Sequence, residues 1–164
     1  FFLIILSILS FFIGFIYEEN STGAGTFNGD FEHLWKNLQT FINNDLSVAI
    51  GFTSNLDAEN FQSSRTPLVY IFHKLFNPFT ENKVSFVRSV FTFSLLAPIL
   101  FYLCLKQKFQ NEDNLLLVLI STTICLSPYF RTSAYWGMEM NYGIICMLAS
   151  IFFFKFLFYL FKKI

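Results

Sequence analysis

The sequence predicts an all-α integral membrane protein with about four transmembrane helices and two amphipathic helices at the membrane interface. Hydrophobic residues make up 54% of the 164 residues, aromatic residues make up 21%, and only 13% are charged, whereas soluble domains are roughly a quarter charged. Several apolar stretches approach the roughly 20 residues that a helix needs to cross a bilayer. The formal net charge is zero and the sequence has no extended basic cluster, which argues against a nucleic-acid partner.

The first apolar stretch, residues 1–16, predicts a membrane helix because it contains no charge. A signal peptide is the alternative, but it needs a basic segment before the apolar run and small residues at a cleavage site. The first is missing here and the second is poor. The chain opens at Phe1 inside this run and stops at Ile164 just after another one, so we expect it to be a fragment of a longer protein.

Residues 17–83 hold most of the acidic residues and predict a long extracytoplasmic loop. Within it, residues 30–44 place apolar residues on one face at helical spacing, namely Phe31, Leu34, Trp35, Leu38, Phe41 and Ile42. Asp30 precedes this stripe and suits an N-cap, because its carboxylate can accept hydrogen bonds from the free N–H groups of a first turn. An amphipathic helix that carries a tryptophan suits the membrane interface.

A loop around Gly51 is expected next, followed by a second interfacial helix within residues 63–79. Pro67 lies near its first turn, where proline is tolerated, and Asn77-Pro78 ends it. Its apolar run is too short to span a bilayer. The single histidine of this helix, His73, is expected to be a surface or packing residue.

Three further apolar stretches predict transmembrane helices at residues 84–105, 114–130 and 142–161. Pro98 can kink the first of them, which neighbouring helices tolerate in a membrane. Loops rich in lysine face the cytoplasm, and one side of these spans is flanked by Lys106, Lys108, Lys162 and Lys163. We therefore expect the 17–83 loop and the short 128–141 loop to share the extracytoplasmic side of a single polytopic domain.

The first group of candidate site residues is Asp30, Glu32 and His33, at the start of the predicted amphipathic helix. A carboxylate at this junction could act as a general base on a hydroxyl group. The structural alternative is that Asp30 caps the helix, and that the other two are ordinary residues of its first turn.

The second group lies in the 128–141 loop. Arg131 stands among aromatic residues that include Tyr135, and its guanidinium suits a phosphate group, although aromatic and arginine residues also anchor membrane interfaces. Glu139 lies at the start of a predicted membrane helix, where ionisable residues are often functional. The alternative is that it pairs with Arg131 or Arg88. Arg65, in the long loop, suits either an anionic headgroup or solvent.

No sequence motif for nucleotide binding, serine hydrolysis or calcium binding is present. The three cysteines lie in apolar stretches without metal-ligand or disulfide spacing, at Cys104, Cys125 and Cys146. A metal site is therefore not predicted from the residues themselves.

Three stretches, in this order and spacing, resemble the GT-C superfamily of membrane glycosyltransferases, and in particular bacterial relatives of the protein mannosyltransferase and aminoarabinose transferase families. They are NGDFEHLW at 28–35, SSRTPLVYIFHKLF at 63–76 followed by the span at 84–103, and LSPYFRTSAYWGMEMNYGII at 126–145. The chain resembles the N-terminal part of such enzymes. It departs from them at the acidic motif, because many members have an adjacent Asp-Glu pair where this chain has Asp30-Phe31-Glu32.

The resemblance implies transfer of a sugar from a polyprenyl-phosphate donor to a hydroxyl group of a glycan, lipid or protein acceptor. Asp30 would deprotonate the acceptor, with Glu32 as the other candidate acid, and Arg131 with Arg65 would hold the departing phosphate. Some relatives use a divalent metal. The expected location is a bacterial inner membrane, with the active site facing the periplasm.

Two other functions stay open. A transporter or flippase fragment would have acidic residues or broken helices near the middle of the membrane. A non-catalytic membrane scaffold subunit would leave its external acidic residues facing solvent separately.

Overall fold

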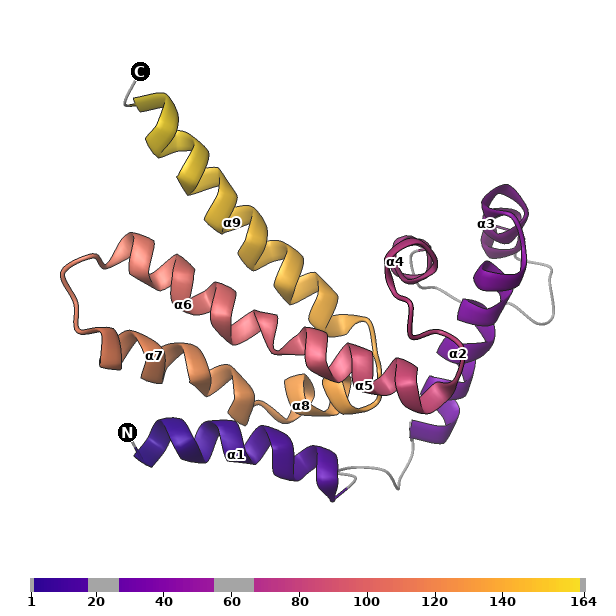
Figure 1. Cartoon of the computed structure of the whole chain (residues 1–164), viewed down its shortest axis with the longest axis horizontal. Coiled ribbons are helices and arrows are strands. Elements are labelled where there is room, and N and C mark those ends of the chain that lie inside the picture. The colour runs from indigo at the N-terminus through magenta and orange to yellow at the C-terminus, as the bar shows by residue number, and fades with distance from the viewer. Residues whose placement is uncertain (1, 18–26, 55–66, 163–164) are drawn as a thin grey trace. The chain divides into compact units, whose positions relative to one another are not determined.

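The computed structural model describes residues 2–17, 27–54 and 67–162, without the side chains of residues 27–30, 52–54, 156 and 158–162. All regular secondary structure in these ranges is helical (Figure 1), so the predicted all-α class is confirmed. The chain divides into two compact units. Unit 1 comprises Phe1–Glu19 and Val90–Ile164, and unit 2 comprises Asn20–Ser89.

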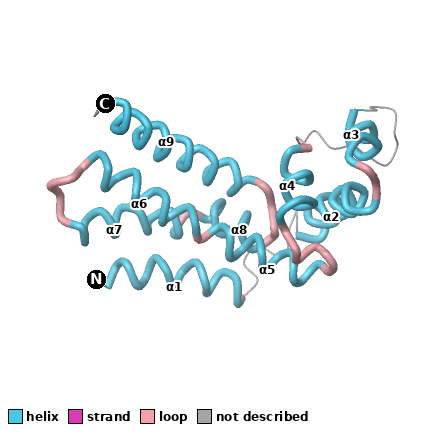
Figure 2. Tube along the Cα trace, turned by 45° about the horizontal axis from the view of Figure 1, so that its top comes forward, coloured by secondary structure: helices cyan, strands magenta, loops and turns pink. Residues whose placement is uncertain are grey.

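Unit 1 is built from the end of α5 (Lys83–Ser94) together with α1 (Phe2–Ile16), α6 (Leu96–Lys108), α7 (Asn114–Thr122), the short 3-10 helix η1 (Thr123–Leu126), α8 (Pro128–Tyr135) and α9 (Met140–Lys162). Helix α6 lies between α7 and α9, and α1 packs against α7, η1 and α8 (Figures 1 and 2).

The apolar stretch predicted at residues 84–105 is a helical run from Lys83 to Lys108 that is interrupted at Leu95. Pro98 accounts for the interruption, because it has no N–H to donate to the carbonyl of Ser94, four residues earlier. At the break, the Leu95 N–H bonds instead to the Thr92 carbonyl, three residues back, at 3.2 Å. The helical hydrogen bonds are thus interrupted before Pro98, and a kink of this helix stays a prediction.

The predicted span over residues 114–130 is helical but broken, and the prediction of a loop over 128–141 is wrong for its first half. The helical path bends by 66° between Leu126 and Pro128, and α8 occupies part of the predicted loop. Ser127 starts α8 by accepting a hydrogen bond on its Oγ from the Phe130 N–H at 3.4 Å, with Pro128 at the first helical position. Serine followed by proline is a strong start signal for a new helix.

Gly137 ends α8 and turns the chain towards α9. Its φ of 68° lies in the left-handed region, which glycine adopts without steric cost. The Met138 N–H reaches back to the Ser133 carbonyl at 2.8 Å, and the Gly137 N–H reaches the Ala134 carbonyl at 3.4 Å. This pair of bonds is a Schellman motif, which satisfies carbonyls that the helix end leaves open.

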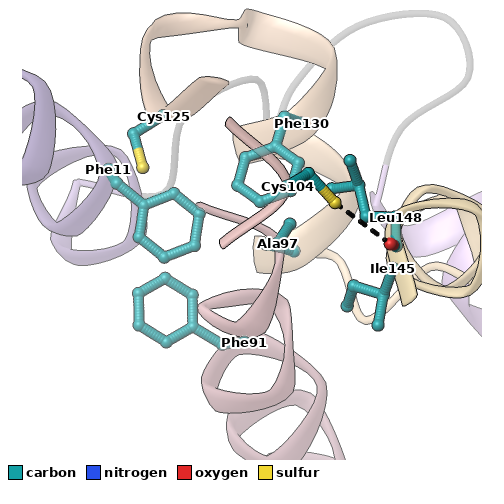
Figure 3. Packing of buried hydrophobic residues seen from close by; sticks show 9 residues of the cluster. Phe11, Phe91, Ala97, Cys104, Cys125, Phe130, Ile145 and Leu148 are labelled. Carbon is teal, nitrogen blue, oxygen red and sulfur yellow. Dashed lines mark hydrogen bonds between the residues drawn. The ribbon is translucent and has the colours of Figure 1, made fainter. Parts of the chain in front are cut away.

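The core of unit 1 is mostly aromatic and aliphatic. Phe11 of α1 stacks on Phe91 of α5 with ring centroids 4.6 Å apart, and it lies 5.5 Å from the ring of Phe130. Figure 3 shows these rings meeting between α1, α5 and α8, with Cys104 Sγ donating to the Leu148 carbonyl at 3.3 Å. These contacts hold α1, α5 and α8 together and join α6 to α9.

The outer surface of unit 1 is also apolar. The buried residues of α1 are Ile4, Ser7, Phe11 and Gly14. Its exposed residues are larger and apolar, namely Phe2, Leu3, Ile5, Leu6, Ile8, Leu9, Phe12, Ile13 and Ile16. Apolar residues therefore lie on the outer face of α1 as well as on its buried face, whereas a helix on a soluble protein has a polar outer face.

By length and composition, one helical run of the described chain could cross a membrane, namely Lys83–Lys108. A second would be added if the bent pair Asn114–Leu126 and Pro128–Tyr135 forms one span. Phe2–Ile16 and Met140–Lys155 are shorter apolar helices. The number of four transmembrane helices therefore stays a prediction.

Unit 2 contains α2 (Phe27–Asn43), α3 (Leu46–Ser54), α4 (Leu68–Phe76) and the first turns of α5. Helix α2 packs against both α3 and α4. The predicted apolar face of α2 is confirmed by the burial of Phe31, Leu34, Leu38 and Phe41. Helix α4 follows Pro67 and ends before Asn77, as predicted.

Two details of unit 2 differ from the sequence-based expectation. Helix α2 begins at Phe27, so Asp30 lies in its first turn and is not the N-cap; Phe27 stands four positions before Phe31 and extends the apolar spacing by one turn. The loop expected around Gly51 is instead helix α3, which buries Ala49 completely.

Candidate functional site

The acidic part of the candidate site is the beginning of α2. Asp30 lies in the first turn, although its side chain is outside the described residues, and Glu32 and His33 are exposed. The Glu32 carboxylate pairs with the ammonium group of Lys83, the first residue of α5. Both partners are about half exposed, and such a surface pair contributes roughly 0–1 kcal/mol.

The other end of α2 is held by a lysine of α4. Lys74 Nζ donates to the carbonyl oxygens of Phe41, Ile42 and Asn44, at 2.7, 3.4 and 2.5 Å. These carbonyls lie at the C-terminus of the helix, where four C=O groups lack helical partners and the helix dipole favours a cation. Lys74 therefore fixes the helix that carries the candidate acids.

A partly buried hydrogen-bond network joins α4 to α5. The two N–H groups of the Asn77 amide face His73 Nδ1 at 3.0 Å and Ser89 Oγ at 2.9 Å. Asn77 Oδ1 accepts from the Phe79 N–H at 2.9 Å, so every polar atom of this side chain is used. His73 is 1% exposed, and its ring lies 4.8 Å from that of Phe86. Burial lowers the pKa of His73 from 6.5 to about 4, so the imidazole is neutral and Nδ1 accepts.

The basic part of the candidate site is α8 in unit 1. Arg131 Nη1 donates to Ser10 Oγ of α1 at 2.8 Å and to the Leu126 carbonyl at 3.1 Å. The second acceptor lies at the bend before α8, where the helical hydrogen-bond ladder is interrupted. The guanidinium thus braces the bend while it remains partly exposed.

Tyr135 and Glu139 lie close to Arg131 in the chain. Tyr135 is buried, and its ring meets that of Phe15 edge to face, with centroids 5.8 Å apart. Glu139 is half-buried in the turn before α9, and its carbonyl accepts from the Tyr142 N–H at 3.0 Å. The buried ring of Tyr135 makes it a packing residue of this corner.

The structure therefore places the predicted residues in two groups. Arg131, Tyr135 and Glu139 belong to unit 1, whereas Asp30, Glu32 and His33 belong to unit 2. The convergence of the two groups on one site stays a prediction. One further candidate, Arg65, lies outside the described residues.

No group of three or more histidine, cysteine, aspartate or glutamate residues in the described ranges is arranged to hold a metal ion. Among those residues, neither unit presents a ligand set for the divalent metal that some glycosyltransferases use.

Sequence reasoning missed the polar residues that position the candidates. Asn141, Ser10 and Ser94 support α8, and Lys74 and Asn77 support α2 and α4. One indication for Asn141 was present in the sequence: an amide at the start of a long apolar helix is costly to bury without hydrogen-bond partners. Its partners are 47 and 11 positions away, so the sequence pattern does not identify them.

Comparison of the chain with family models, curated proteins and solved structures gives no match.

Proposed function

We propose that this chain is part of a membrane-embedded glycosyltransferase that moves a sugar from a polyprenyl-phosphate donor to a hydroxyl acceptor at the extracytoplasmic face. The acceptor is a glycan, a lipid or a protein. The observation that carries the proposal is a guanidinium held at the end of apolar helices: Arg131 is braced by Ser10 and Leu126 on a short helix that follows a bend.

The membrane location is supported by the apolar outer face of unit 1. Exposed leucine, isoleucine and phenylalanine residues line α1, and α9 also exposes Ile151, Phe153, Phe154 and Leu157. Apolar area in contact with water costs roughly 25 cal/mol per Å², and large exposed apolar surfaces mark contact with lipid or protein. A lipid-borne donor would reach a site at the edge of such a surface without leaving the bilayer.

The chemistry follows from the charges. Sugar transfer releases a polyprenyl phosphate, and negative charge develops on its oxygen as the bond to the sugar breaks. A fixed guanidinium stabilises that charge most strongly in the transition state, which lowers the barrier. Asp30 is proposed to take the proton of the acceptor hydroxyl. The Lys83 partner of Glu32 makes Glu32 the less suitable of the two acids for this step.

The test is sugar transfer in lipid vesicles that contain the full-length protein and a radiolabelled polyprenyl-phosphate sugar. Asp30→Asn and Arg131→Ala should each abolish transfer while the protein still inserts and accumulates. Asp45→Asn and Lys108→Ala are matched controls, since both residues are exposed and neither belongs to the proposed site. Normal transfer by both site variants would refute the assignment.

One observation favours the transporter alternative, namely the 66° bend between η1 and α8, because discontinuous helices form binding sites in transporters. The transporter alternative would be supported if the same vesicles took up or flipped a labelled lipid and if Arg131→Ala left the rate of that process unchanged.

A further inference from the structure

The beginning of α9 holds a buried amide that the proposed chemistry does not use. Asn141 is 1% exposed. Its Nδ2 donates to Ser94 Oγ of α5 at 3.0 Å and to the Phe130 carbonyl of α8 at 3.0 Å. One side chain of α9 therefore ties together three helices of unit 1.

The orientation of this amide is fixed by its partners. The Phe130 carbonyl can only accept, so the amide nitrogen must face it. Ser94 Oγ donates its own hydrogen to the Val90 carbonyl at 2.9 Å and is left as an acceptor for Asn141. Among the described residues Asn141 Oδ1 is buried without a hydrogen-bond partner, so the amide contributes the two bonds that it donates.

The residue that Asn141 holds is the neighbour of Arg131. Phe130 is fixed at three points: its ring lies in the core beside Phe11, its N–H is capped by Ser127, and its carbonyl is bound by Asn141. Arg131 follows directly, with its guanidinium on Ser10 and Leu126. A long arginine side chain can meet a phosphate in one geometry only if its backbone is held.

We propose that Asn141 is a positioning residue for Arg131, fixing the first turn of α8 against α5 and α9 so that the guanidinium keeps one place. This inference rests on the proposed function for the role of Arg131, but the fixing of α8 can be measured separately. The most direct variant is Asn141→Asp, which has nearly the same shape. Its carboxylate has no N–H groups to donate to Ser94 Oγ and the Phe130 carbonyl. Asn141→Leu removes both bonds without adding a charge.

The first measurement does not need activity. A spin label at Tyr129→Cys reports the motion of α8, because Tyr129 is 86% exposed. It is placed in a Cys146→Ser background, since Cys146 is exposed whereas the other two cysteines are buried. We expect Asn141→Leu to increase the mobility of this label and to leave a control label at Leu115→Cys on α7 unchanged. Unchanged mobility at position 129 would overturn the proposal.

The second measurement is a double-mutant comparison of transfer in vesicles. Asn141→Leu should lower kcat roughly 10- to 100-fold, the scale of a misplaced catalytic group. Arg131→Ala should then cost much less in the Asn141→Leu background than in the wild-type background, because the two act as a unit. If Arg131→Ala lowered kcat by the same factor in both backgrounds, the proposed coupling between Asn141 and Arg131 would be overturned. If Arg131→Ala alone leaves transfer normal, the proposed function fails while the label still tests the fixing of α8.

A milder variant covers the case in which both Asn141 variants fail to fold. Ser94→Ala removes one of the two acceptors and keeps the bond to Phe130. It should raise the mobility of the label at position 129 by a smaller amount, and Ser94→Thr, which retains a hydroxyl group, should restore the wild-type value. Equal label mobility in wild type, Ser94→Ala and Ser94→Thr would count against the proposal.

Discussion

The buried imidazole of His73 makes the stability of unit 2 depend on pH. The unfolded chain takes up a proton near the ordinary pKa of 6.5, whereas the folded chain does so only near about 4. Between these values the unfolded state binds more protons, so the free energy of unfolding falls as pH decreases. The free energy of unfolding changes by about 1.4 kcal/mol per pH unit between these two pKa values, which amounts to about 3 kcal/mol over the whole interval. The stabilisation is complete above pH 6.5 and lost by about pH 4.

The assay uses tryptophan fluorescence during urea unfolding. Trp35 and Trp136 are the two tryptophans of the chain, and a Trp136→Phe background leaves Trp35 as the reporter. Its ring lies 5.6 Å from that of Phe86, the same ring that His73 contacts. Unfolding free energies measured at pH 7, 6, 5 and 4 should fall by about 3 kcal/mol in total.

The comparison variants decide whether His73 causes this dependence. His73→Phe removes the titrating group, so the slope between pH 6.5 and 4 should become shallower by the amount that His73 contributes. His33→Gln is the matched control, because His33 is exposed on α2, and it should retain the slope of the wild type. An identical pH dependence in wild type and His73→Phe would refute the reasoning.

Three further predictions concern the ends of helices. Lys74→Met should destabilise unit 2 by about 2 kcal/mol, since it leaves the carbonyls at the end of α2 without their cationic donor, and an unchanged urea midpoint would contradict this. Gly137→Ala should lower the free energy of unfolding by about 1 kcal/mol, because alanine resists a positive φ. Gly143→Ala, with open space around the added Cβ, should instead stabilise α9 by roughly 0.5 kcal/mol. The two variants must therefore shift the thermal unfolding temperature in opposite directions. Asp113→Ala should cost about 1 kcal/mol by removing the cap that accepts from Leu115, and Asp113→Asn should recover most of the loss if capping is the cause.

Local patterns were sufficient for most helices. The spacing of Phe31, Leu34, Leu38 and Phe41 predicts the buried face of α2 because a helix repeats every 3.6 residues and one side of it faces the core. The limits of α4 follow from Pro67 and Asn77 for equally local reasons. Of the candidate site, the sequence identified Arg131, but it gave no indication of what holds the guanidinium.

Elements in which two local signals compete were predicted less well. The apolar content of residues 114–130 favoured one continuous helix, while Ser127-Pro128 favoured a new start, and the structure follows the second signal. Helix α3 was missed because Gly51 was grouped with the turn-forming residues that follow it, Asn55, Asp57 and Asn60, and the apolar residues before it were given less weight.

Composition and spacing alone determined that this chain is helical, which segments are apolar and where several helices begin or end, because these properties depend on residues within one or two turns of each other. Only the tertiary structure decided which polar groups meet. Arg131 and Ser10 are 121 positions apart. Lys74 donates to the carbonyls of residues 30 to 33 positions before it in the chain. Such partners are chosen by the packing of whole helices, since a buried donor must take whichever acceptor that packing brings within hydrogen-bond distance.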